Sequence, residues 1–217
     1  YTMKKDFVIT IMDNEHSVQM ADRCISTFEK HNPKTTIEKF DAVTPAKNPF
    51  SLAELWKIPT KNFIEKYSRH ERCVSAFLSH MSLWRKSMEL DEPIIIFEHD
   101  AVTVAPIRIP HFTGLINLGK HSNGKFKMPQ LGVGPLVSKQ YMPGAHAYAI
   151  RPEAARLLCE QAVFDAAPTD VYLNRKLFPW IQELYPWPVE CRDTFTTIQN
   201  ETGCLAKHNY GQDYEII

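Results

Sequence analysis

The chain has 217 residues, of which 44% are hydrophobic, so it can bury a sizeable core as one large domain or two small ones. Lysine plus arginine and aspartate plus glutamate number 25 each, and the resulting net charge of zero argues against a general polyanion binder, although local basic patches remain compatible with it. No apolar run is long enough to span a bilayer and the first residues do not form a signal peptide, so we expect no stable membrane insertion.

The first predicted unit is a strand, a helix and a second strand. Apolar residues 7–12 indicate a buried strand, and Ser17 is a suitable N-cap for a helix that extends to about Phe28. Residues 35–43 indicate the second strand. Such a unit at the start of a chain is typical of nucleotide-binding α/β sheets.

The next part of the chain contains the clearest predicted helix. Residues 44–70 contain three prolines and indicate short helices in an irregular excursion. Residues 71–90 follow, with apolar side chains that recur at three- and four-residue steps. His80 lies at the edge of this apolar stripe, and on that pattern alone a hydrogen-bonded core histidine is favoured over a ligand.

An apolar run from Ile94 to Phe97 leads directly into Glu98-His99-Asp100. A strand that is apolar on both faces needs cover on both faces, as a central parallel strand has. In open α/β sheets, ligands bind just past the C-terminal ends of such strands. The two carboxylates can hold a hard divalent cation, which in turn can hold a diphosphate; the alternative is an acidic strand end that caps the next turn.

The second half of the chain begins with a strand predicted over residues 115–118. Residues 120–134 are glycine-rich and basic, which is compatible with a solvated loop or with a lid over a phosphate-bearing ligand. Residues 144–150 indicate a strand of small residues, and a helix is predicted from 153 to 162.

Asp170 opens a further predicted helix that extends to about Leu177, where the carboxylate could simply favour the helix N-terminus electrostatically. Prolines and tryptophans between 179 and 188 indicate a rigid aromatic segment. Residues 194–198 predict a last short strand, and the tail that contains His208 is expected to be irregular.

The five cysteines are odd in number and widely spaced, without a C-x-x-C pair. This pattern is neither a disulfide framework nor a zinc site. At least three fall in apolar helical patterns, where buried and inert thiols are expected. We therefore expect a reducing, cytoplasmic compartment.

Taken together and in this order, these pieces resemble glycosyltransferase family 25, which includes lipopolysaccharide and collagen galactosyltransferases. The strongest match is the helix over residues 73–85, CVSAFLSHMSLWR, followed by a strand that ends in 98–100, where the family has Glu-Asp-Asp. A second match is a G-x-x-A-Y-x-I-x-x-x-A-A-x-x-L pattern over 144–158, followed by a Pro-Thr-Asp step that ends at Asp170. The resemblance covers nearly the whole chain.

One departure and two weaker matches qualify the resemblance. Arg23 in the first helix and residues 40–43 match less well. His99 stands where the family has its first aspartate, and although histidine can ligate Mn²⁺, it removes a negative charge from the site. This substitution leaves two interpretations open: an active transferase, or a catalytically degenerate nucleotide-sugar or glycan-binding protein of the same fold.

The resemblance implies a GT-A-like α/β fold, in which residues 1–217 form one domain with a mostly parallel central sheet flanked by helices. It also implies a hexosyltransferase that moves a hexose from a nucleotide diphosphate sugar, with UDP as the expected nucleotide, to a hydroxyl acceptor with inversion. Mn²⁺ or Mg²⁺ would stabilise the leaving diphosphate as a Lewis acid. The expected ligands of this ion are Glu98, His99, Asp100 and His208.

By the same resemblance, Asp170 is the candidate base that removes a proton from the acceptor hydroxyl. The candidate contacts for the nucleotide are Thr10, Asp13, Arg23, Val43, Ser79 and His80. The acceptor stays open between a lipopolysaccharide sugar, a protein side chain and a modified nucleic-acid base, and so does the oligomeric state. A metal-dependent phosphoesterase is the rival enzyme class, but it would normally display more than one cluster of metal ligands.

Overall fold

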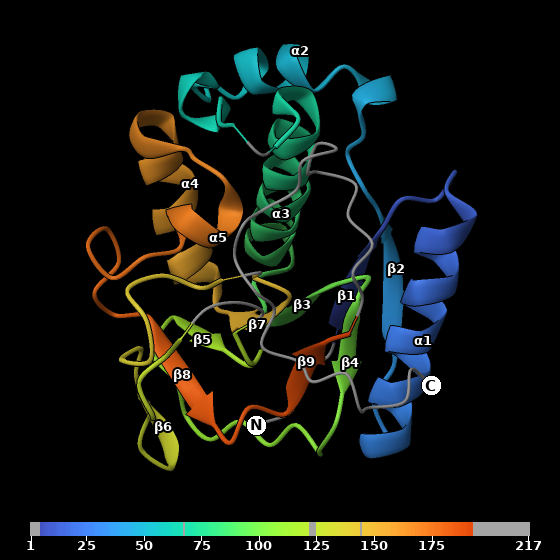
Figure 1. Cartoon of the computed structure of the whole chain (residues 1–217), viewed down its shortest axis with the longest axis vertical. Coiled ribbons are helices and arrows are strands. Elements are labelled where there is room, and N and C mark those ends of the chain that lie inside the picture. The colour runs from blue at the N-terminus through green and yellow to red at the C-terminus, as the bar shows by residue number, and fades with distance from the viewer. Residues whose placement is uncertain (1–4, 67, 122–124, 144, 193–217) are drawn as a thin grey trace.

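The computed structural model describes residues 5–66, 68–121, 125–143 and 145–192. Within these ranges a seven-stranded sheet is flanked by helices, and a two-stranded sheet lies beside it (Figure 1). The predicted α/β class is confirmed.

The secondary structure follows the chain order shown in Figure 1. The strands are β1 (Lys5–Thr10), β2 (Ile37–Asp41), β3 (Ile94–Glu98), β4 (Ala101–Thr103), β5 (Leu115–Asn117), β6 (Gly132–Pro135), β7 (Ala147–Ile150), β8 (Gln182–Tyr185) and β9 (Val189–Cys191). The helices are α1 (Glu15–His31), α2 (Pro49–Leu55), α3 (His70–Leu90), α4 (Pro152–Asp165) and α5 (Thr169–Tyr172), with short 3-10 helices η1 (Pro45–Lys47) and η2 (Lys61–Phe63).

The large sheet is mixed, with the strand order β2-β1-β3-β7-β5-β8-β6. β1 pairs in parallel with both β2 and β3, and β5 pairs in parallel with β8. β7 is antiparallel to both of its neighbours, β3 and β5, and β6 is antiparallel to β8. The parallel arrangement expected for a nucleotide-binding sheet therefore lies in β2-β1-β3, where the C-terminal ends of β1 and β3 meet at one edge.

Strand β3 is covered on both faces, as its continuous apolar run predicts. Ile94 and Ile96 pack into the core beneath α3 and α4, whereas Ile95 and Phe97 pack into the core beneath α1. All four side chains are buried. Because burial of such side chains stabilises a fold by about 1.5–3 kcal/mol each, this strand fixes the position of the acidic residues that follow it.

The cap of α1 differs from the prediction. Asn14, not Ser17, is the N-cap: its side-chain oxygen accepts a hydrogen bond from the backbone N–H of Ser17 at 3.0 Å. The Ser17 hydroxyl instead accepts from the backbone N–H of Ile11 at 2.9 Å and contacts His99. The prediction of Ser17 as N-cap was wrong because a tertiary contact engages that hydroxyl.

The C-terminal part differs from the predictions in two places. The helix predicted from Asp170 to Leu177 ends at Tyr172, so its predicted length was wrong. The aromatic segment over residues 179–188 contains β8, which the surrounding prolines concealed in the sequence. The strand predicted over 194–198 lies outside the described residues.

Two further features concern membranes and thiols. Among the helices that the structure describes, none is sufficiently long and apolar to cross a bilayer. Cys24 and Cys73 are buried thiols in α1 and α3, as the apolar helical patterns predict.

Asp6 on β1 is a buried carboxyl group. Its Oδ1 accepts a hydrogen bond from the backbone N–H of Ile95 at 3.2 Å, and its Oδ2 has no hydrogen-bond partner in the described part of the chain. Burial raises the pKa of Asp6 to about 7, and the hydrogen bond from Ile95 opposes this shift. The folded chain therefore retains a proton that the unfolded chain loses, and the stability contributed by Asp6 falls as the pH rises from about 4 to about 7.

We expect Asp6→Asn to stabilise the protein more at pH 8 than at pH 5, because asparagine cannot ionise and keeps an acceptor for the Ile95 N–H. The gain in the free energy of unfolding should be larger at pH 8 by on the order of 2 kcal/mol. Urea denaturation at both pH values measures the difference. Glu38→Gln, at an exposed position of β2, is the control and should show no such difference. An equal gain for Asp6→Asn at both pH values would exclude ionisation as the cause.

Candidate functional site

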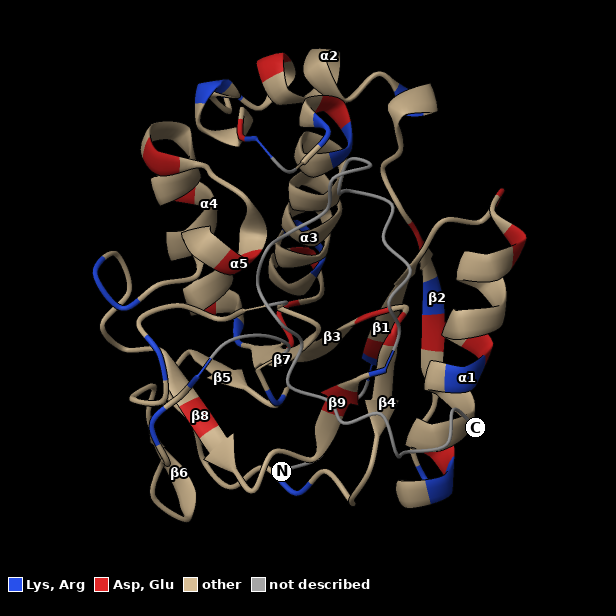
Figure 2. Ribbon diagram, in the orientation of Figure 1, with Lys and Arg blue, Asp and Glu red and all other residues tan. Residues whose placement is uncertain are grey.

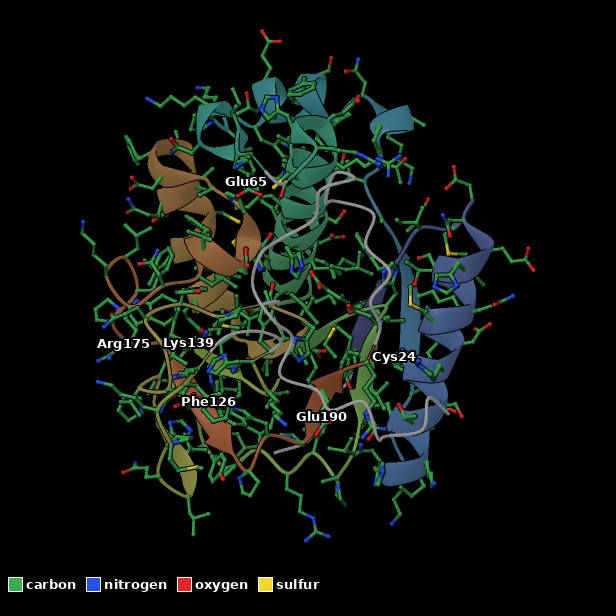
Figure 3. All side chains as sticks on the ribbon, in the orientation of Figure 1. Cys24, Glu65, Phe126, Lys139, Arg175 and Glu190 are labelled. Carbon is green, nitrogen blue, oxygen red and sulfur yellow. The ribbon has the colours of Figure 1, made fainter. Side chains whose placement is uncertain are left out.

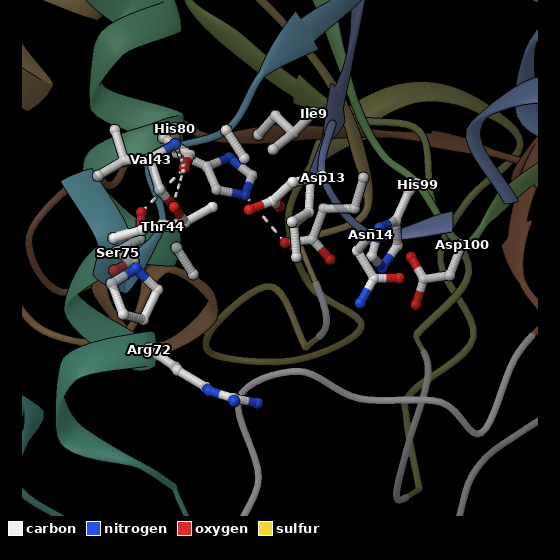
Figure 4. A pocket seen from close by; sticks show the side chains of 17 residues that line it. Ile9, Asp13, Asn14, Val43, Thr44, Arg72, Ser75, His80, His99 and Asp100 are labelled. Atoms are coloured by element: carbon white, nitrogen blue, oxygen red, sulfur yellow. Dashed lines mark hydrogen bonds and ion pairs between the residues drawn. The ribbon is translucent and has the colours of Figure 1, made fainter. Parts of the chain in front are cut away.

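A pocket of about 450 Å³ opens at the C-terminal ends of β1 and β3 (Figure 4). Its walls come from the turn between β1 and α1, the segment after β2, the N-terminal half of α3 and the acidic end of β3. The lining residues are Ile9, Ile11, Asp13, Asn14, Ala42, Val43, Thr44, Pro45, Ala46, Arg72, Ser75, Ala76, Ser79, His80, Glu98, His99 and Asp100. This is the edge of a parallel sheet at which α/β proteins bind ligands.

The pocket brings together most of the candidate residues predicted from the sequence, namely Asp13, Val43, Ser79, His80, Glu98, His99 and Asp100. Thr10 does not line it, because this side chain is buried and its hydroxyl donates to the Val8 carbonyl oxygen at 3.0 Å. Arg23 does not line it either, and its guanidinium donates to the Arg192 carbonyl oxygen at 3.3 Å. His208 lies outside the described residues.

The sequence reasoning missed several pocket residues. Arg72, Ser75 and Ala76 line the pocket from α3, and Asn14 lines it from the α1 cap. The signal for the first three was present, because they precede Ser79 by seven, four and three residues and so share its helical face. Once Ser79 was a candidate, helical periodicity would have found them.

A chain of hydrogen bonds leads from the core to the acidic end of the pocket. Trp84 Nε1–H donates to the Tyr148 hydroxyl oxygen at 2.8 Å, and that hydroxyl lies 2.7 Å from His80 Nδ1. His80 Nε2 lies 2.9 Å from Glu98 Oε1. Burial raises the pKa of Tyr148 well above its ordinary value, so the tyrosine keeps its proton.

These contacts determine which nitrogen of His80 carries the proton. Because the Tyr148 oxygen accepts from Trp84, its own proton is directed to His80 Nδ1. Burial lowers the pKa of His80 to about 3, although the charge of Asp170 opposes the shift, so the ring is neutral. The remaining proton therefore lies on Nε2, which donates to Glu98. His80 is thus a hydrogen-bonded core histidine whose edge reaches the pocket.

Acidic side chains gather at the end of β3. Burial raises the pKa of Glu98 well above its ordinary value, and the carboxylates of Asp100 and Asp170 raise it further. Asp100 Oδ2 accepts a hydrogen bond from the Cys191 thiol at 2.9 Å. Asp100 Oδ1 is buried and has no hydrogen-bond partner among the described residues. Asp170 does not line the pocket, but its charge acts on groups that do.

His99 ties the end of β3 to the start of α1. Its Nδ1 lies 2.6 Å from Ser17 Oγ. Figure 4 shows His99 and Asp100 with Asn14 on one side of the pocket and His80 on the other. Within the described ranges, no group of three or more histidine, cysteine, aspartate or glutamate side chains is arranged to hold a metal ion.

The hydroxyl group of Ser79 connects α3 to the segment after β2. It accepts from the backbone N–H of Val43 at 2.9 Å and lies 2.9 Å from the Ser75 carbonyl oxygen, to which it donates. Ser79 therefore shapes the pocket wall through Val43.

Arg72 adds a cation to the pocket. Its side chain is exposed and extends from α3 at the edge of the pocket (Figure 4). The N-cap of the same helix, Arg69, provides no side-chain hydrogen bond to the first turn. Backbone N–H groups at a helix N-terminus favour anions, so the guanidinium and the helix end together suit an anionic group.

One comparison with known protein families matches the part of the chain that contains the pocket. Residues 3–106 match the profile of glycosyltransferase family 25, described as an LPS biosynthesis protein. The matched region contains every residue that lines the pocket and ends before β5. No curated protein matches the chain.

We expect Tyr148→Phe to lower the free energy of unfolding by about 2–3 kcal/mol, because it leaves the Trp84 N–H and His80 Nδ1 buried without a partner. Urea denaturation measures the change. Tyr172→Phe is the matched control: its hydroxyl donates to a single carbonyl oxygen, that of Leu158, at 2.5 Å, so the expected loss is about 1 kcal/mol. Equal losses for the two variants would contradict the role of Tyr148 as the link between Trp84 and His80.

Proposed function

We propose that this chain, in which residues 3–106 match the profile of glycosyltransferase family 25, transfers a hexose from a nucleotide diphosphate sugar to a hydroxyl group, with inversion. The observation that carries the proposal is the pocket of about 450 Å³ at the ends of β1 and β3, which combines an acidic end with an arginine at its edge. This volume and this mixture of groups suit a nucleotide ligand. Given the family description, we favour a sugar of a growing lipopolysaccharide as the acceptor. UDP stays the nucleotide that the resemblance of the sequence implies.

Four pocket residues are our proposed contacts for the nucleotide: Asp13, Val43, Ser79 and His80. We add Arg72, whose guanidinium can pair with diphosphate oxygens in a bidentate way. Thr10 and Arg23 are not retained for this role, since their side chains donate to carbonyl groups outside the pocket.

The acidic end of β3 fits a hard divalent cation in one respect. Asp100 Oδ1 is a buried carboxylate oxygen without a hydrogen-bond partner among the described residues, and Mn²⁺ and Mg²⁺ prefer such ligands. We propose that Asp100, Glu98 and His99 hold the ion together with His208. When bound, it would supply Lewis-acid stabilisation of the charge on the leaving diphosphate. The hydrogen bond from His80 fixes the orientation of the Glu98 carboxylate at this end.

Asp170 is the proposed base. In its ionised form it would take the proton from the acceptor hydroxyl as the oxygen attacks the anomeric carbon from the side opposite the leaving group. Its influence on the pKa of both Glu98 and His80 supports this role, because the charge must lie close to the acidic end of the pocket. Asp170 lies on α5, whereas the proposed metal ligands from Glu98 to Asp100 lie at the end of β3.

We expect the protein to release a nucleoside diphosphate from one of a panel of nucleotide sugars, and only with Mn²⁺ or Mg²⁺ present. Asp100→Asn should lower this rate by roughly a hundredfold or more, since the substitution weakens the proposed ion site. Asp91→Asn, at the exposed end of α3, is the control and should leave the rate unchanged.

Metal-dependent nucleotide binding without turnover would instead favour a catalytically degenerate binding protein of the same fold. Absence of both turnover and binding would exclude the transferase proposal.

We expect Arg72→Ala to raise the dissociation constant for UDP, measured by calorimetry with Mn²⁺ present, by roughly tenfold, or about 1.4 kcal/mol. The reason is the loss of a charged hydrogen-bond donor at the pocket edge. Arg69→Ala removes the same charge one turn earlier, outside the pocket, and should change the constant little. Equal weakening by the two variants would mean that Arg72 acts only through the general charge of the surface.

A further inference from the structure

Two stretches of the chain carry positive charge without any acidic residue, although the formal net charge of the whole chain is zero. No aspartate or glutamate occurs between Asp100 and Glu153, although this interval contains several lysines and arginines. A second acid-free stretch between Asp170 and Glu183 contains an adjacent arginine and lysine. Figure 2 shows lysine and arginine along the loops beside β6.

Backbone hydrogen bonds bring these basic segments together at the β6 edge of the sheet. The backbone N–H of Lys127 donates to the Ser138 carbonyl oxygen at 2.9 Å, and that of Arg175 donates to the Gln140 carbonyl oxygen at 2.8 Å. Figure 3 shows Lys139 beside Arg175 on this side of the molecule. We call this surface the basic edge; it consists of Lys125, Lys127, Lys139, Arg175 and Lys176.

The acidic residue of β8 cannot neutralise this surface, because its carboxylate is turned inward. Glu183 is only 1% exposed. Its Oε1 accepts from the backbone N–H groups of Val137 and Ser138, each at 3.2 Å, and its Oε2 accepts from the Ser138 hydroxyl. The buried His121 contacts the same hydroxyl through Nε2. The carboxylate of Glu183 is therefore hydrogen-bonded in the interior, whereas Lys125, Lys127 and Lys176 of the basic edge are exposed.

Two large apolar side chains are exposed beside the basic edge. Leu131 is 78% exposed and Met128 is 68% exposed, on the turn between Lys127 and β6. The turn is anchored from within by Phe126, whose ring centroid lies 5.1 Å from that of Trp187. Large apolar side chains that an anchored turn holds in solvent, next to cations, indicate a surface that binds a partner.

We propose that the basic edge and the turn from Met128 to Leu131 bind the surface of a bilayer that contains anionic lipid. The cations attract anionic headgroups, and the two apolar side chains enter the interfacial layer. A soluble polyanion would satisfy the cations but would leave Met128 and Leu131 in water, so both parts of the surface favour the bilayer. In the strand order, β6 lies at the far side of β7 from β1 and β3, so this surface is separate from the pocket.

Co-sedimentation of the full chain with phosphatidylcholine vesicles, with or without about 30% phosphatidylglycerol, tests the proposal without nucleotide, sugar or metal. We expect binding only to the anionic vesicles, and weaker binding as salt is added. Lys125→Glu/Lys127→Glu should lower the partition coefficient by roughly tenfold or more. Lys30→Glu/Lys34→Glu is the matched control, with the same change in net charge at exposed positions near the end of α1, and should lower it far less.

A second pair of variants tests the apolar part. Leu131→Ser should lower binding to anionic vesicles roughly threefold or more, because it removes an inserted side chain. Leu55→Ser on α2 is the matched control, since Leu55 is 74% exposed and of the same residue type. It should leave the binding unchanged.

Three results would overturn the proposal: no binding of the unmodified chain to anionic vesicles, equal binding to neutral and anionic vesicles, or equal losses in a variant and its control. Binding to heparin without binding to vesicles would also overturn it and would assign the basic edge to soluble polyanions. Because the assay contains no donor, these outcomes are independent of the transferase activity proposed above.

Discussion

The hydrogen-bond chain from Trp84 through Tyr148 and His80 to Glu98 is the constraint on which the rest of the site depends. The side chains of Trp84, Tyr148 and His80 in it are buried, and a buried polar group without its hydrogen bond costs about 1–3 kcal/mol, so each of the three depends on the others. It connects α3, β7 and β3, and these elements determine the shape of one side of the pocket. A single neutral histidine thereby links packing in the core to the orientation of a carboxylate at the surface of the pocket.

Two carboxyl groups are held in different ways around this site. Asp100 is held from β9 through the thiol of Cys191, and Glu98 is held from α3 through His80. Positive charge comes from Arg72 and from the N-terminus of α3. The pocket therefore has acidic and basic parts that can bind different portions of one ligand, as a nucleotide diphosphate sugar with its cation would require.

The sequence pattern predicted an element correctly where the local preferences of its residues and their tertiary packing favour the same structure. The four apolar residues before Glu98 predicted a covered central strand, and the periodicity of residues 71–90 predicted α3 nearly to its ends. Prediction was poorer where tertiary contacts determine the role of a side chain. Ser17 was predicted to be a helix N-cap, but its hydroxyl accepts a hydrogen bond from the backbone N–H of Ile11 and contacts His99. Nothing in the local sequence distinguishes a threonine that faces a ligand from one that bonds its own strand, as Thr10 does.

The position of β7 has a consequence for how the chain can be divided. In the sheet, β7 lies between β3 and β5. β3 belongs to the family-matched region, whereas its neighbour β7 follows residue 106 and lies outside that region. A fragment that ended at residue 106 would expose one edge of β3 and would leave His80 without Tyr148 and Asp100 without Cys191. The two halves are therefore interdependent in folding, and because their pairings are distant in sequence, ordering them requires closing long loops before the core is complete.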